Sequence, residues 1–116
     1  MPVDIKRVYD QPKKDDGYRV LVDRIWPRGL TKEKAQIDEW AKDIAPPNEL
    51  RKWFHKNESK WDEFQKKYQS YLAENKDKIE SLIDLSRRQK VTLLFASRRH
   101  QLNNASVLKD YIEKHS

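Results

Sequence analysis

Charged side chains follow two apolar runs of this sequence, at the places where buried strands would end. The first run, Val20–Val22, is followed by Asp23, by Arg24 and, within a turn that contains Pro, by Arg28. Consecutive apolar residues indicate burial on both faces of a strand, as in the middle of an α/β sheet. Arginine guanidinium groups bind phosphate or carboxylate through paired hydrogen bonds, so this stretch predicts an anion site.

The second apolar run, Val91–Ala96, is followed by a similar group of polar residues, Ser97, Arg98, Arg99 and Asn103. Ligands of open α/β sheets gather outside the carboxyl ends of the strands. A helix that begins near Asn104 would add backbone donors for an anion. We therefore expect one ligand-binding crevice at this edge, at which Arg24, Arg28 and Arg98 converge. Its predicted lining is Asp23, Arg24, Arg28, Arg98 and Asn103.

Two residues of this region are candidates for catalysis. Asp23 could act as a general base, because burial beside a strand end raises the pKa of a carboxyl group. Ser97 is the one obvious hydroxyl near the second strand end, although the sequence indicates no His that would activate it. The structural alternative is that Asp23 pairs with an Arg and fixes the turn at Trp26–Gly29. The residues alone do not decide between binding and turnover.

Other kinds of site are excluded by composition. Two Gly residues cannot build a Walker A loop or a G-x-G-x-x-G turn. There is no Cys, and His55, His100 and His115 lie far apart, so we expect no metal site and no cofactor. The longest apolar run is far shorter than the ~20 residues that span a bilayer, and no signal-peptide pattern is present. A cytoplasmic protein without membrane contact is expected.

The charge balance favours anionic partners. Lys and Arg outnumber Asp and Glu by 25 to 19, which gives a formal net charge of +6. The preferred interpretation is a small phosphorylated or carboxylated ligand, held in the Arg-lined crevice. The alternative is a nucleic-acid-binding or regulatory module that uses the basic surface. The sequence does not indicate an oligomeric state.

The order of strand and helix patterns predicts a single α/β domain over residues 1–116. We expect a small, mostly parallel sheet of three strands, near residues 3–9, 18–26 and 90–97, flanked by about five helices. The direction of the first strand relative to the second stays open. The eight residues between them suit a hairpin, but in extended form they could also cross over to a parallel strand.

Helical periodicity and capping residues predict the helices. Thr31 is the expected cap of a helix whose apolar face is Ile37, Trp40, Ala41 and Ile44. Caps for later helices are expected at Asn48, at Ser59, and at Asn103 or Asn104. Large aromatic rings order a core, and we expect three of them to be largely buried: Trp26, Trp40 and Trp53.

The segment Val22–Gly29, which reads Val-Asp-Arg-Ile-Trp-Pro-Arg-Gly, is highly specific. Through it the chain closely resembles the YeaO-like branch of the domain of unknown function 488, a bacterial family. The likeness covers nearly the whole chain, in the segments Lys6–Asp10, Asp16–Gly29, Asp38–Trp40, Ala45–Pro46, Glu49–His55, Thr92–Phe95 and Asn103–Ala105 and at Trp61, Phe64 and Tyr68. The resemblance implies a small α/β domain with a mostly parallel sheet, and it implies no established activity.

The resemblance also brings out two departures. In the family, an Asp or Asn often stands at the position of Arg99, and a His commonly stands at the position of Asn104. If that His acts as a base in relatives, this chain lacks it. The departures therefore argue against an acid–base enzyme and leave the binding interpretation untouched.

Overall fold

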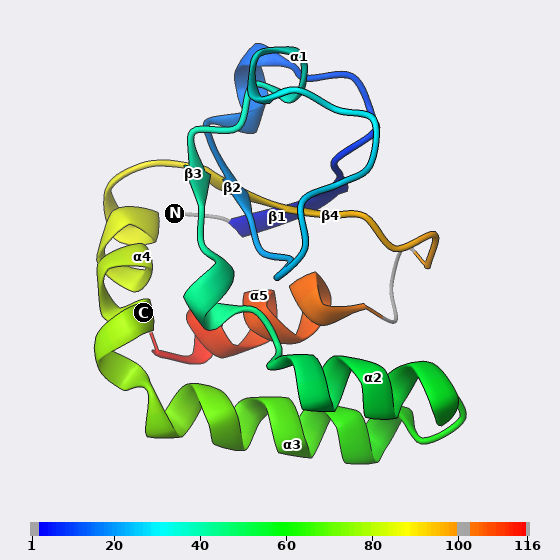
Figure 1. The fold of residues 1–116 in the computed structure, drawn as a ribbon. Coiled ribbons are helices and arrows are strands. Elements are labelled where there is room, and N and C mark those ends of the chain that lie inside the picture. The colour runs from blue at the N-terminus through cyan, green and yellow to red at the C-terminus, as the bar shows by residue number, and fades with distance from the viewer. Residues whose placement is uncertain (1–2, 100–102, 116) are drawn as a thin grey trace.

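The sheet is built entirely of parallel strands. The protein is described here by a computed structural model that covers residues 3–99 and 103–115. In that part of the chain the strands are β1 (Val3–Arg7), β2 (Tyr18–Leu21), β3 (Glu39–Trp40) and β4 (Val91–Phe95), in the order β1-β4-β2-β3 (Figure 1). The predicted α/β class is confirmed, with four strands in place of three.

Strands β1 and β2 both pair in parallel with β4, so the chain between them crosses over β4. Val91 of β4 is in register with Val3 on one side and with Tyr18 on the other. The connection contains the 3₁₀ helix η1 (Lys14–Asp16). The buried Asp16 side chain holds it in place by forming ion pairs with Lys6 and Arg19, at 3.1 and 2.5 Å. The structure thus establishes the strand direction that the sequence left open.

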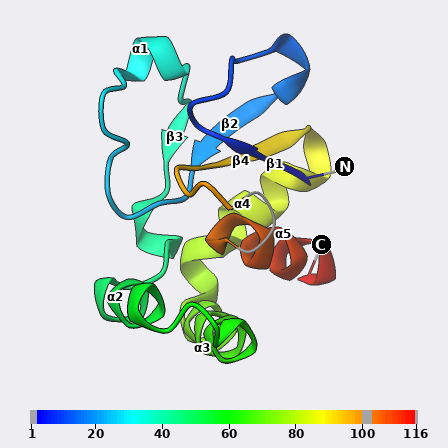
Figure 2. The same ribbon diagram turned by 90° about the vertical axis from the view of Figure 1, so that its right-hand side faces the viewer.

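The helices are divided unequally between the two faces of the sheet. The described residues form α1 (Lys32–Ala35), α2 (Asn48–Lys56), α3 (Trp61–Glu74), α4 (Lys76–Arg88) and α5 (Asn104–His115). Helices α2 to α5 lie on one side of the sheet and α1 on the other (Figure 1 and Figure 2). None of the described helices is long and apolar enough to cross a membrane.

Burial on both faces explains the unbroken apolar runs. Val20 and Val22 of the first run join Leu93 of the second in the large core that α3, α4 and α5 cover. Leu21 and Leu94 point the other way, into a smaller cluster beneath α1. All five of these residues are fully buried, as the period of two along a strand requires. The strand ends, where the polar residues follow, are therefore fixed by the core.

The prediction of a long helix after Thr31 is wrong. Thr31 does cap α1, because its Oγ1 accepts from the Lys34 backbone N–H at 3.1 Å, but the helix ends at Ala35. The chain then pairs with the open edge of β2: the Asp38 carboxylate accepts from the Arg19 backbone N–H at 2.9 Å. Strand β3 and the 3₁₀ helix η2 (Lys42–Ile44) follow. Pairing with β2 prevailed over the helical pattern.

Burial of the tryptophans also differs from the prediction. Trp40 is 38% exposed, because it belongs to the edge strand β3 and not to a buried helix face. Its ring packs edge-on against Trp26, with 5.2 Å between centroids. Trp26 and Trp53 are half-buried. A Trp40→Ala substitution therefore removes a contact at the sheet edge and not a piece of the core.

Of the remaining caps, only the last is confirmed. Helices α2 and α3 have Pro47 and Lys60 at their N-caps, and neither end has a side-chain cap from Asn48 or Ser59. Before α5, the Asn103 Oδ1 accepts from the Ser106 backbone N–H at 3.0 Å. This hydrogen bond satisfies one of the free N–H groups of the first turn.

The two glycines offer a matched test of the crossover. Both have positive φ, +69° at Gly17 and +83° at Gly29. A Cβ at Gly17 would lie 2.4 Å from the Lys90 carbonyl oxygen, whereas a Cβ at Gly29 would meet nothing within 4 Å. That carbonyl accepts the Tyr18 N–H at 3.0 Å, where β2 begins.

We expect Gly17→Ala to lower the free energy of unfolding by more than about 2 kcal/mol, because backbone strain of about 1–3 kcal/mol adds to the displaced carbonyl. Gly29→Ala carries only the strain and should cost about 1 kcal/mol. Urea denaturation of the two variants measures the difference. Equal losses would show that contact between a Cβ at position 17 and the Lys90 carbonyl oxygen does not affect stability.

Candidate functional site

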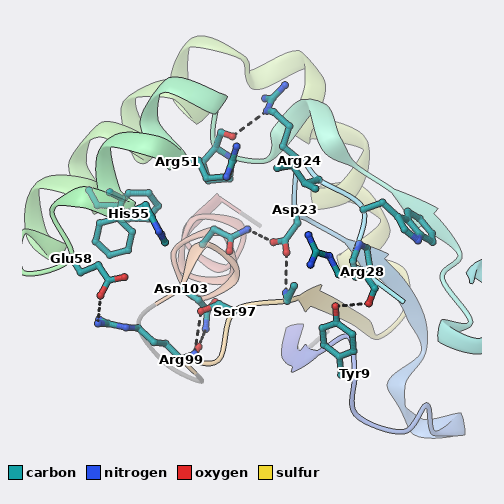
Figure 3. Close-up of a pocket in the computed structure, with 18 residues that line it drawn as sticks. Tyr9, Asp23, Arg24, Arg28, Arg51, His55, Glu58, Ser97, Arg99 and Asn103 are labelled. Carbon is teal, nitrogen blue, oxygen red and sulfur yellow. Dashed lines mark hydrogen bonds and ion pairs between the residues drawn. The ribbon is translucent and has the colours of Figure 1, made fainter. Parts of the chain in front are cut away.

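A pocket of about 440 Å³ lies at the carboxyl edge of the sheet, where β2 and β4 end (Figure 3). That volume falls in the range of about 300–1,000 Å³ that is usual for small-molecule sites. The lining is Tyr9, Asp23, Arg24, Ile25, Trp26, Pro27, Arg28, Pro46, Arg51, Phe54, His55, Glu58, Phe64, Ala96, Ser97, Arg99, Asn103 and Asn104. The segments after three parallel strands thus meet α2 and the start of α5, as the rule for α/β sheets predicts.

Asp23 connects the elements around this pocket. Its Oδ2 accepts from the Ala96 backbone N–H at 2.9 Å, just after β4. Its Oδ1 accepts from the Asn104 side-chain amide at 3.0 Å, and the same amide donates to the Val22 carbonyl at 2.8 Å. The Trp40 indole N–H donates to the Asp23 carbonyl at 2.7 Å. One residue therefore joins the ends of β2 and β4, the first turn of α5, and β3.

Burial raises the pKa of Asp23 above its ordinary value of 3.8. The hydrogen bonds from Asn104 and Ala96, and then the positive charge of Arg51, act against that rise. The direction agrees with the predicted effect of burial at a strand end. Each carboxylate oxygen has two acceptor positions, so donors from Ala96 and Asn104 leave acceptor capacity for a ligand.

Arg24 lines the pocket, but its Nε and Nη2 donors are already used. Its Nε donates to the Pro46 carbonyl at 3.1 Å, and its Nη2 donates to the Ala45 carbonyl at 3.0 Å and to the Tyr71 hydroxyl at 3.4 Å. These hydrogen bonds attach the end of β2 to the segment between η2 and α2. Among the described residues Asp23 forms no hydrogen bond or ion pair with an arginine, so the pairing expected as the structural alternative is not seen, and Arg24 instead binds carbonyl oxygens and a hydroxyl.

Arg28 and Arg51 are the cations that remain available. Both are exposed and both line the pocket, and among the described residues neither guanidinium has a hydrogen-bond or ion-pair partner. The Arg28 carbonyl accepts the Tyr9 hydroxyl at 2.9 Å, which fixes its loop. In Figure 3, Arg51 is seen on the α2 side of Asp23 and Arg28 on the side of the loop after β2.

The loop after β4 contributes differently from what the sequence predicts. Arg98 is exposed and is not part of the pocket lining. Arg99 does line the pocket, and it forms an ion pair with Glu58 at 2.7 Å. Ser97 also lines the pocket, and its Oγ accepts the Arg99 backbone N–H at 3.1 Å. The buried Asn103 lines it too, but its amide donates to the Arg99 carbonyl at 2.7 Å. The structure thus brings together all predicted site residues except Arg98.

Arg51 and His55 are pocket residues that were not predicted from the sequence. Both lie on α2, far in sequence from either strand end, and both line the pocket. The only signal was their place in a segment that resembles the family. No group of three or more His, Cys, Asp or Glu within residues 3–99 and 103–115 could hold a metal ion. His100 lies outside the described residues.

The lining carries a net positive charge. Four arginines face two carboxylates, so the formal excess is 4 − 2 = +2 with His55 neutral. The Arg99–Glu58 pair cancels internally, and Arg24 is held by carbonyl groups. Arg28 and Arg51 are therefore the groups that an anion would meet.

A titration tests the environment of Asp23. We expect the pKa of Asp23 in the folded protein to exceed 3.8, and Asn104→Ala to raise it further, because that substitution removes a hydrogen bond to the ionised form. A carboxyl-detected NMR titration of both proteins measures these values. A pKa at or below 3.8 in the unsubstituted protein would contradict the effect of burial.

The same shift predicts a pH dependence of stability. The folded state binds the Asp23 proton more tightly than the unfolded state, so protonation favours folding. This contribution is complete below pH 3.8 and is lost as the pH rises through the folded pKa. The free energy of unfolding, taken relative to Asp23→Asn, should therefore fall across that window. If the free energy of unfolding relative to Asp23→Asn rises with pH instead, the raised pKa of Asp23 is contradicted.

Comparison with known proteins identifies the family. Residues 2–116 match the family described as "Inactive DUF488-N3 subclade". The chain is 41% identical over 112 residues to the uncharacterized protein YeaO of Escherichia coli (strain K12), covering 97% of each chain. It is 42% identical over 106 residues to the uncharacterized protein Rv3073c of Mycobacterium tuberculosis (strain ATCC 25618 / H37Rv), covering 91% of this chain and 89% of that one.

No solved structure matches the protein. The family match extends over nearly the whole chain, and the likeness to YeaO includes both the strand ends and α2. The chain that forms the pocket around Asp23 therefore belongs to the YeaO-like branch of the domain of unknown function 488 family.

Proposed function

We propose that the protein binds a small phosphorylated or carboxylated molecule in the Asp23 pocket. The observation that carries the proposal is the pair Arg28 and Arg51, which line one pocket without hydrogen-bond or ion-pair partners among the described residues. A guanidinium presents its donors in a planar fork that matches phosphate and carboxylate oxygens. The cytoplasmic location predicted from the sequence is part of this proposal.

The other predicted site residues take supporting roles in this proposal. Arg24 and Asn103 line the pocket and hold its walls through their hydrogen bonds to backbone groups. Asp23 holds the strand ends together and offers its remaining acceptor positions to donors of the ligand. Arg98 is a candidate for a peripheral contact only, because it is exposed and outside the lining.

We further propose that the ligand is bound and not turned over. Asp23 uses both of its oxygens as acceptors for Ala96 and Asn104, which supports a structural role. Asn104 stands where the resemblance implies a His, and an amide cannot act as a base at neutral pH. Ser97 has no described His hydrogen-bonded to it. The description of the family as an inactive subclade supports the same proposal.

Thermal stabilisation by inorganic phosphate tests the proposal directly. A ligand at 100 times its dissociation constant stabilises the folded state by about 2.7 kcal/mol, which shifts the melting temperature measurably. We expect Arg28→Ala and Arg51→Ala each to remove most of this shift. Arg88→Ala is the matched control, because Arg88 is exposed on α4 and outside the pocket.

Arg98→Ala tests the position that the sequence predicted, and we expect a smaller loss than for Arg28→Ala. An unchanged phosphate shift in both the Arg28 and Arg51 variants would exclude this pocket as the anion site. Loss of the shift in Arg88→Ala as well would indicate general binding to the basic surface.

The nucleic-acid alternative makes a different prediction. Binding by a dispersed basic surface releases counterions, so its affinity falls steeply with salt, whereas a pocket with few contacts is screened less. We expect duplex DNA and RNA to bind no more tightly than about 10⁻⁴ to 10⁻⁶ M at physiological salt. Fluorescence anisotropy over a salt series measures this. Nanomolar, salt-sensitive binding that survives Arg28→Ala would favour the alternative.

A further inference from the structure

The pocket has an apolar part that a small anion would leave empty. Eight of its lining residues are apolar or aromatic: Tyr9, Ile25, Trp26, Pro27, Pro46, Phe54, Phe64 and Ala96. A phosphate or carboxylate held by Arg28 and Arg51 would fill only a small part of the pocket volume of about 440 Å³. The rest of the pocket therefore suits a ligand that also carries an apolar group.

Exposed apolar side chains are concentrated at this pocket. The large hydrophobic residues that are exposed in the described part of the chain are Ile25 (54%), Tyr9 (43%) and Trp40 (38%). Ile25 and Tyr9 line the pocket, and Trp40 packs against its lining residue Trp26. Leaving such side chains in water is unfavourable, so a ligand that covers them gains free energy.

Side-chain hydrogen bonds of its two neighbours hold Ile25 in this exposed position. On one side Arg24 is attached to the Ala45 and Pro46 carbonyls. On the other side the Trp26 indole N–H donates to the Leu30 carbonyl at 2.7 Å. With both neighbours fixed, Ile25 cannot turn into the core without breaking these hydrogen bonds. Its exposure is a property of the folded loop.

Tyr9 places an aromatic face next to the anion-binding loop. Its hydroxyl donates to the Arg28 carbonyl at 2.9 Å, which attaches the ring to the loop that carries this arginine. The Arg7 guanidinium lies 5.2 Å from the ring centroid and covers part of the ring. The exposed remainder can stack with a flat ring of the ligand, as aromatic side chains do with bases.

We infer that the ligand is a phosphate ester that carries a flat aromatic ring and a hydroxyl or amino donor, the chemistry of a nucleoside monophosphate. The phosphate would pair with Arg28 and Arg51, the ring would cover Tyr9 and Ile25, and the donor would bind the open acceptor positions of Asp23. This inference rests on the proposed anion site and adds the ring and the donor to it.

Three kinds of probe separate these contributions. Isothermal titration calorimetry with AMP, GMP, CMP and UMP presents ring and phosphate together, ribose 5-phosphate lacks the ring, and the nucleoside of the tightest nucleotide lacks the phosphate. We expect at least one of the four nucleotides to bind about 10-fold or more tighter than ribose 5-phosphate, which corresponds to ~1.4 kcal/mol of ring contact. That nucleoside should bind more weakly than its nucleotide, because it has no phosphate to pair with Arg28 and Arg51.

One variant tests the apolar wall. Ile25→Ser should weaken the tightest nucleotide several-fold and leave ribose 5-phosphate unchanged, so the ringless ligand is the internal control. Ile25 is 54% exposed, so the substitution should leave the fold intact.

The outcomes distinguish the two proposals. If ribose 5-phosphate binds as tightly as every nucleotide, or if Ile25→Ser weakens both equally, the ring contact is overturned and the anion site stands. If the nucleoside of the tightest nucleotide binds as tightly as that nucleotide, the phosphate has no role and both proposals fail. If none of these probes binds, the nucleotide inference is overturned, and the inorganic phosphate experiment decides whether the anion site stands.

Discussion

The need to satisfy one partly buried carboxylate organises the end of this protein at which the pocket lies. An ionised carboxylate that leaves water must receive hydrogen bonds, or its burial destabilises the fold. Asp23 receives them from the backbone after β4 and from Asn104 at the start of α5, while Trp40 of β3 donates to its carbonyl. The elements that surround the pocket are thereby held in fixed positions. Burial still raises the pKa of Asp23, so the donors compensate only in part.

The arginines around this carboxylate divide into those that build the pocket and those that face its interior. Arg24 is held by carbonyl oxygens and Arg99 by Glu58, so their charges are used within the fold. Arg28 and Arg51 are left without such partners in the described part of the chain. In the proposed function, this division would give a protein with a modest net charge of +6 a localised anion site.

The same geometry bears on binding and turnover. A residue that closes the fold has little freedom to change its protonation state during a reaction, since each change alters the stability of the strand ends. Asn104 holds Asp23 and also the end of β2, which is a structural role for the position at which the resemblance implies a His. A binding function uses this rigidity directly, because a preformed pocket loses less entropy when a ligand is bound.

Local patterns in the sequence determined three of the four described strands, most of the helices and the edge of the sheet at which the pocket lies. The buried runs Val20–Val22 and Val91–Phe95 are explained by burial on both faces, and Asn103 caps α5 as its residue type predicts. Only the tertiary structure decided that residues 39–40 would form β3, that Arg51 would reach the pocket from α2, and that Arg98 would lie outside its lining. The physical reason is the distance along the chain over which each effect acts. Periodicity and capping act within a few residues, whereas strand pairing and the convergence of charges join residues far apart in the chain.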